Sequence, residues 1–176
     1  MKLQSIVAIS LVCLVGCKSK KAMDYNNLIV KKQKSLAAAM DATEPQLKNY
    51  FANYQYDSIV NVSTRMESRI DSILVDLQRK PAPNAKQGDN FKKAALNYFN
   101  FMKSKYTSYK NYGLQTTPQG RMFQLQVMNG MTNQEDKAVA DMQQAQRIFA
   151  KDNGFKISEE KKSDNRSLTA SPSNER

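Results

Sequence analysis

The residues of this chain that could do chemistry are two cysteines close to its start and a set of carboxylates and lysines further along. Cys13 and Cys17 carry the only thiols among the 176 residues, and histidine is absent. Without an imidazole the chain can form no Ser-His-Asp or Cys-His nucleophile, no histidine-bound zinc site and no facial-triad iron site. We therefore expect a protein without enzymatic activity, cofactor or metal.

Cys17 stands between an apolar segment and a run of lysines. Residues 3–14 have the composition of the apolar core of a signal peptide. They are too few for a permanent membrane span, which needs about 20 residues. The segment ends in Leu14-Val15-Gly16-Cys17, which resembles the lipobox of bacterial lipoproteins.

This resemblance implies that residues 1–16 form a lipoprotein signal peptide that is cleaved between Gly16 and Cys17. It also implies a diacylglyceryl thioether on Cys17 and an acyl chain such as palmitate on the new amino terminus. Two or three chains anchor a protein stably, because each buried methylene contributes about 0.8 kcal/mol. The alternatives are an ordinary secretory peptide with an incidental cysteine, or a poorly anchored short helix.

The charge balance of the chain is strongly basic. It has 27 lysines and arginines against 16 acidic residues, and loss of residues 1–16 would remove only Lys2. Residues 17–21 are predicted to form a short lipidated tether, whose lysines would each favour anionic headgroups by roughly 1 kcal/mol near a membrane. A tether that is merely solvated is the alternative. We expect the protein in the bacterial cell envelope, on the outer membrane, with its domain facing the periplasm rather than the cell surface.

The remaining sequence has the pattern of helices. Apolar residues recur every three or four positions, which is the period of a helix. The periodic segments are residues 22–42, 45–79, 89–112 and 118–152. They predict an all-α fold, an antiparallel up-down four-helix bundle over residues 22–157 that ends at Asn153 and Gly154. Residues 158–176 contain one large apolar residue, so we expect a disordered C-terminal tail.

Short breaks are expected between the segments. Thr43 and Pro45 predict a helix end and a new start, since threonine can cap a helix and proline suits its first turn. Gly130 could kink the fourth segment or split it near Thr132, where Glu135 would complete a capping box.

The third segment interleaves aromatic rings with lysines. Seven of the fifteen aromatic residues fall within residues 91–112, and most of these rings are expected to fill the core while the lysines face solvent. Such a pattern can bind single-stranded nucleic acid, but the lipobox argues against that partner. Phe101 lies off the apolar stripe. We therefore name Phe101, Lys103, Lys105 and Lys110 as a candidate interaction patch.

A pair of carboxylates in the second segment could form a small ionic site. Glu67 and Asp71 stand four residues apart on one helix face and are flanked by Arg65 and Arg69. We favour the simpler interpretation, a solvated face of mixed charges beside the apolar stripe. The methionines of the last segment, among them Met122, are expected in an adaptable core rather than at a copper site.

Three further stretches follow Cys17 in order along the chain. They are Asp24-Tyr25-Asn26-Asn27, Phe91-Lys92-Lys93-Ala94-Ala95-Leu96-Asn97-Tyr98-Phe99 and Ala145-Gln146-Arg147-Ile148-Phe149-Ala150-Lys151. Together they resemble a family of small all-helical surface lipoproteins from leptospires and the Bacteroidota, over residues 17–157. The family has no established activity, so the resemblance implies a helical fold and a lipid on Cys17, and no further site residue.

These features predict a membrane-anchored envelope lipoprotein without catalytic function. Its partners would be the membrane, through the lipid on Cys17, and an envelope protein or an anionic lipid or glycan bound by a basic helical surface. The alternative is a periplasmic helical bundle that binds or senses a small ligand. Nucleic acid is not an expected partner.

Overall fold

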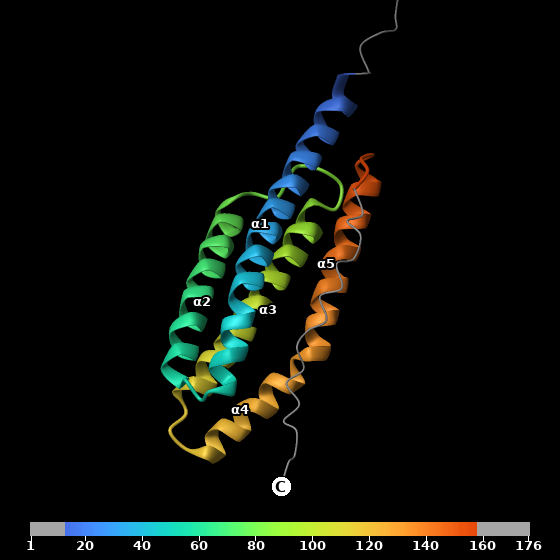
Figure 1. Ribbon diagram of the computed structural model, residues 1–176. Helices are drawn as coiled ribbons and strands as arrows, with labels where there is room; N and C mark the ends of the chain where they lie inside the picture. The colour runs from blue at the N-terminus through green and yellow to red at the C-terminus, as the bar shows by residue number, and fades with distance from the viewer. Residues whose placement is uncertain (1–12, 158–176) are drawn as a thin grey trace, which may run out of the picture.

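The computed structural model describes residues 13–157, with side chains from Ser19 onward. This part of the chain is a helical bundle without strands, as predicted (Figure 1). Most of the expected signal peptide, residues 1–12, and the expected tail, residues 158–176, lie outside the described residues. The helices are α1 (Cys13–Ala52), α2 (Tyr56–Arg79), α3 (Gly88–Leu114), α4 (Pro118–Gly130) and α5 (Thr132–Asp152).

The core is built around α3, which packs against α2, α4 and α5. Phe91 of α3 stacks on Phe149 of α5, with ring centroids 4.7 Å apart, and meets Tyr25 of α1 edge-on at 6.1 Å. The buried apolar side chains of α3 follow the helical period: Phe91, Ala95, Phe99, Met102, Tyr106 and Tyr112. The aromatic residues expected in the core are therefore largely there.

α2 packs against both α1 and α3. Toward α1, the Lys32 ammonium lies 2.5 Å from a carboxylate oxygen of Asp76, and the Thr43 hydroxyl donates to the Met66 sulfur at 3.6 Å. The buried apolar residues of α2 are Ile59, Val62, Met66, Ile70, Ile73, Leu74 and Leu77. This stripe is wide because neighbouring pairs of positions both face the core.

The expected helix break at Thr43 and Pro45 is wrong. α1 continues through Pro45 to Ala52, so it is the longest helix, and residues 45–52 of the expected second segment belong to it. Leu36 and Leu47, on either side of the proline, are both buried in the core. Apolar packing on both sides therefore outweighs the roughly 3 kcal/mol that a proline costs inside a helix.

The chain turns at residues 53–55 instead. Tyr54 adopts φ 55°, a left-handed conformation that is uncommon for a residue other than glycine. The turn is held by the Gln55 N–H, which donates to the Tyr50 carbonyl at 2.9 Å, and by the Asn53 amide, which donates to the Asn49 carbonyl at 2.9 Å. No glycine or proline marks this turn in the sequence.

The fourth segment is split into two helices. α4 ends at Gly130 and α5 begins at Thr132, at the point where the sequence allowed either a kink or a break. The expected capping box is absent, because Thr132 is already helical and the Glu135 carboxylate accepts a hydrogen bond from Lys105 instead. Glu135 therefore contacts α3 instead of capping its own helix.

Two helix ends are formed by the residues that their local sequences provide for capping. The Thr117 hydroxyl caps α4 by accepting from the Gly120 N–H at 3.1 Å. After α5, Gly154 takes the left-handed conformation with φ 71°, and the Phe155 N–H donates back to the Ala150 carbonyl at 3.1 Å. The stop expected at Gly154 is confirmed.

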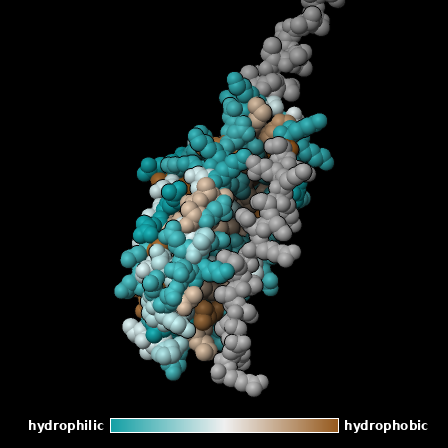
Figure 2. Space-filling view, viewed as in Figure 1, coloured by the Kyte–Doolittle hydropathy of each residue, from teal (hydrophilic) through white to brown (hydrophobic). Residues whose placement is uncertain are grey.

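α4 crosses one end of the bundle and buries no side chain. The expectation of a methionine core is correct for Met142, and wrong for Met122, which is exposed. Figure 2 shows hydrophobic atoms at this end of the molecule. The exposed apolar side chains here come from α4 and from the last residue of α3. We call them together the α4 apolar face: Leu114, Met122, Phe123, Leu125 and Val127.

Substitution of one buried and one exposed phenylalanine tests which side chains form the core. Phe99→Ala removes a fully buried ring and is expected to lower the free energy of unfolding by about 3–5 kcal/mol. Phe123→Ala removes the same atoms from a side chain that is 61% exposed. This substitution should change the free energy of unfolding by less than about 0.5 kcal/mol. Urea unfolding measures both, and equal losses would contradict the described core.

Candidate functional site

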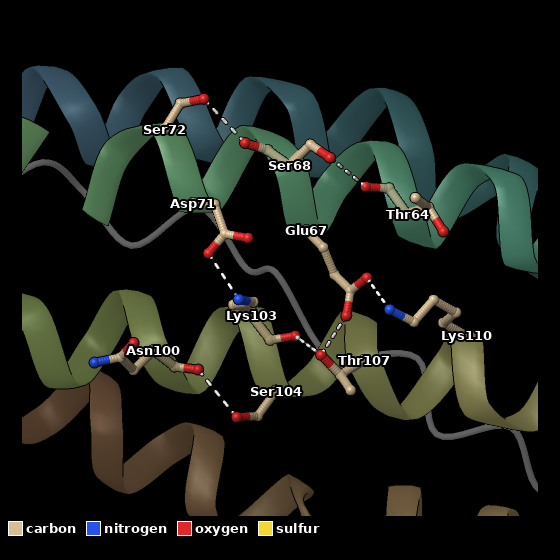
Figure 3. Close-up of polar contacts among 10 residues, drawn as sticks. All are labelled: Thr64, Glu67, Ser68, Asp71, Ser72, Asn100, Lys103, Ser104, Thr107 and Lys110. Atoms are coloured by element: carbon tan, nitrogen blue, oxygen red, sulfur yellow. Dashed lines mark hydrogen bonds and ion pairs between the residues drawn. The ribbon is translucent and has the colours of Figure 1, made fainter. Parts of the chain in front are cut away.

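The clearest polar site in the described residues is a seam between α2 and α3. Glu67 of α2 is only 7% exposed. Its carboxylate accepts a hydrogen bond from the Thr107 hydroxyl at 2.5 Å and forms an ion pair with the Lys110 ammonium (Figure 3). Both partners come from α3, so this buried charge joins the two helices.

A second ion pair lies one turn further along the seam. Lys103 of α3 lies 2.7 Å from a carboxylate oxygen of Asp71, and both side chains are roughly half-exposed. The hydroxyls around these pairs bond within their own helices: Ser68 donates to Thr64, Ser72 to Ser68 and Ser104 to Asn100 (Figure 3). The seam therefore has the chemistry of a helix–helix contact, with no hydroxyl next to a free base.

The solvated face expected for Glu67 and Asp71 is correct for Asp71 only. Glu67 is buried because it lies on the wide apolar stripe of α2, directly beside Met66. A buried carboxylate is tolerated when its charge is paired and its oxygens are hydrogen-bonded, and here Thr107 and Lys110 do both.

A second polar site joins three helices around Lys105. The ammonium of this residue lies 3.1 Å from Glu135 of α5 and 3.4 Å from Glu44 of α1, and its side chain is 12% exposed. Burial opposes the charge of Lys105, but Tyr109 and the two carboxylates outweigh it, so the pKa of Lys105 is raised. We call this group the three-helix junction.

Tyrosines surround the three-helix junction. Burial raises the pKa of the Tyr98, Tyr106 and Tyr109 hydroxyls, and the Glu135 carboxylate adds to each shift. Tyr106 is fully buried and its hydroxyl has no hydrogen-bond partner among the described residues. Deprotonation of these three hydroxyls therefore requires a higher pH than that of an ordinary tyrosine.

The four residues of the predicted interaction patch are placed on different sides of α3. Lys103 and Lys110 face α2, where each binds a carboxylate. Lys105 lies in the three-helix junction, and Phe101, expected to be exposed, is half-buried against the core. The structure therefore does not gather these side chains into one surface, and their binding role stays a prediction.

Two shallow grooves lie on the α3 side of the bundle. The first, of about 400 Å³, lies between α3 and α5 and includes Phe101, Lys137 and Asp141. The second, of about 530 Å³, lies where α3, α4 and α5 meet and is lined mainly by serine, threonine, asparagine and glutamine side chains. Neither groove pairs a nucleophile with a base.

The remaining predicted site residues, Gly16 and Cys17, fall in the first turns of α1, and their side chains lie outside those described. No helix in residues 13–157 is long and apolar enough to cross a bilayer. Within the same residues, no three acidic or thiol side chains lie together as a metal site would require.

Comparisons with protein-family models, with curated proteins and with solved structures return no match to this chain. The resemblance to helical surface lipoproteins and the lipobox therefore stay predictions from the sequence.

Removing a partner of Glu67 should destabilise the fold more than breaking the exposed pair beside it. Lys110→Ala leaves the Glu67 carboxylate buried and unpaired, so we expect a loss of about 2–4 kcal/mol in the free energy of unfolding. Lys103→Ala breaks an exposed pair and should cost at most about 1 kcal/mol. Urea unfolding of both variants tests this, and a reversed order would contradict the described burial of the Glu67–Lys110 pair.

The three-helix junction predicts that stability falls in alkaline solution. Unfolded tyrosine and lysine titrate near pH 10.0 and 10.5, and the pKa values in the fold are higher. Above about pH 10 the folded state therefore holds more protons than the unfolded state, and stability falls as pH rises. Tyr98→Phe with Tyr109→Phe should flatten this fall in urea unfolding, whereas Tyr54→Phe, at an exposed ring, should not. Stability that is unchanged up to about pH 11 would contradict the assignment.

Proposed function

We propose that this protein is a lipid-anchored helical module of the bacterial envelope that acts by binding rather than by catalysis. Its partner would be an envelope protein or an anionic envelope component, held by a basic helical surface. The observation that carries the proposal is Leu14-Val15-Gly16-Cys17, placed behind an apolar segment and before three lysines. We place the module on the outer membrane, facing the periplasm.

The first turns of α1 support a short distance between lipid and domain. Residues 17–21, expected to form a short lipidated tether, are helical and continuous with the rest of α1. At a rise of 1.5 Å per residue, Ala22, the first buried side chain, lies about 8 Å along the helix from Cys17. A lipid on Cys17 would hold the end of the bundle directly at the membrane surface.

We further propose that the four long helices form an antiparallel up-down bundle. Across α2 and α3 the contacting residues run in opposite order, since Lys103 meets Asp71 and Lys110 meets Glu67. The pairs across α3 and α5 reverse in the same way: Phe91 with Phe149, and Lys105 with Glu135.

A role in binding is also supported by the way in which the buried polar side chains are paired within the fold. The buried and half-buried carboxylates Glu67, Glu44 and Glu135 are each held by a lysine. The serine hydroxyls of the seam donate to backbone carbonyls. These groups stabilise the fold, and none is placed as the acid, base or nucleophile of a reaction.

A second candidate function is a module that binds a small ligand. The observation that favours it is the groove between α3 and α5, where the ring of Phe101 lies beside Lys137 and Asp141. An aromatic surface next to both charges could orient an amphipathic molecule. The groove is shallow, so we rank this candidate second.

The two cysteines provide a matched test of the anchor. Cys17→Ala should abolish incorporation of labelled palmitate in a bacterial host and should release the chain from the outer-membrane fraction. Cys13→Ala changes the same side chain four residues earlier and should leave labelling and fractionation unchanged. Labelling that persists in Cys17→Ala, or that needs Cys13, would contradict the proposed lipid site.

A further inference from the structure

At one end of the bundle the exposed basic side chains clearly outnumber the acidic ones. We call this end the basic end and define it as the described residues 19–24, 79–89 and 151–157. Its acidic residues are Asp24, Asp89 and Asp152, and all three are exposed. Its basic residues are more numerous and also exposed: Lys20, Lys21, Arg79, Lys80, Lys86, Lys151 and Lys156.

Contacts between the helices bring these three segments together. The Asn153 amide, just after α5, donates to the Lys86 carbonyl in the α2–α3 loop at 2.8 Å. The Lys92 ammonium at the start of α3 donates to the Lys80 carbonyl at 2.7 Å. Tyr25 of α1 packs on Phe91, close to the start of α3. Figure 1 shows the first turns of α1 projecting from this end.

The lysines of the basic end are available to a partner. Every ion pair recorded for the described residues uses a different lysine, such as Lys32, Lys103 or Lys105. Among the described residues, no lysine of the basic end therefore takes part in an ion pair within the fold.

The opposite end of the bundle has little charge. In the described residues 48–60 and 111–131 the charged side chains are Lys48, Asp57 and Arg121. The Arg121 guanidinium lies over the Tyr56 ring, 4.1 Å from its centroid. This end carries the α4 apolar face, so the molecule has one basic end and one apolar end.

The basic end is also the end that carries Cys17. The helix rise places Lys20, Lys21 and Ala22 within about 8 Å of Cys17 along α1, which is close to the distance over which charges act at physiological salt. Residues 158–176 add no net charge, because they hold four acidic and four basic residues.

We propose that the basic end is a docking surface for the anionic phospholipid headgroups of the membrane that holds the lipid on Cys17. This inference rests on the proposed function for its placement, and it names the anionic partner of that function. Each lysine near an anionic bilayer adds attraction that salt weakens. Docking would orient the bundle upright and present the α4 apolar face away from the membrane.

Vesicle binding of a chain that begins at Lys18 tests this without the anchor. Such a chain lacks Cys17 and the apolar segment, and it keeps the whole core, because the buried residues run from Ala22 to Ala150. We expect it to float with vesicles of equal phosphatidylcholine and phosphatidylglycerol at low salt. It should not float with phosphatidylcholine alone, and about 0.5 M salt should release it.

Two triple variants of equal net charge locate the surface. Lys86→Gln, Lys151→Gln and Lys156→Gln remove exposed lysines of the basic end and should weaken binding at least roughly tenfold. The matched control removes three exposed basic side chains from elsewhere and should weaken binding less than about threefold: Lys31→Gln, Lys48→Gln and Arg65→Gln.

Equal weakening by the two triple variants would overturn the proposal, because binding would then follow net charge alone. A folded chain that does not bind anionic vesicles would also overturn the proposal. The partner of the basic end should then be sought among proteins with an acidic surface. The anchor is judged separately by palmitate labelling of Cys17. Vesicle binding without labelling would therefore reject the anchor and support the docking surface. Labelling without vesicle binding would support the anchor and reject the docking surface.

Discussion

The burial of one aromatic-rich helix, α3, is the constraint on which the rest of this structure depends. Burial of its apolar rings is favourable, and α1, α2 and α5 each contribute buried apolar side chains to the same core. The stacking of Phe91 on Phe149 fixes α5 beside the start of α3, and Phe51 meets Tyr109 of α3 edge-on at 5.7 Å. With no thiol after Cys17, no disulfide can replace this packing, and the core alone must hold the fold.

A helix that is covered on several sides must also pair the charges that it carries. Lys105 and Lys110 belong to α3, and each is held by a carboxylate from a neighbouring helix. Since a buried charge without its partner is costly, these pairs also favour one register of the helices over others. The lysines of the basic end take no part in such a pair among the described residues, so they can bind a partner outside the fold.

Local pattern was enough to predict most of the helices, and tertiary packing decided the rest. The periodicity of residues 89–112 predicted α3 almost to its ends, and Gly154 correctly marked the end of α5. The helix break predicted at Pro45 was wrong, because the core contacts on both sides of the proline cannot be predicted from the local sequence. The burial of Glu67 and the exposure of Met122 depend in the same way on which helix lies opposite. The basic end was only partly foreseeable, because its charges come from three segments that are far apart in the chain.

These observations describe an elongated helical bundle with exposed lysines at one end and an apolar helix at the other. We propose that the end with the lysines also carries a lipid on Cys17. The most direct test of this account is the mass of the N-terminal peptide of the wild-type chain, purified from bacterial membranes. The account predicts a peptide that begins at Cys17 and carries a diacylglyceryl group and an added acyl chain. A peptide that begins at another residue, or that carries Cys17 as a free thiol, would contradict it.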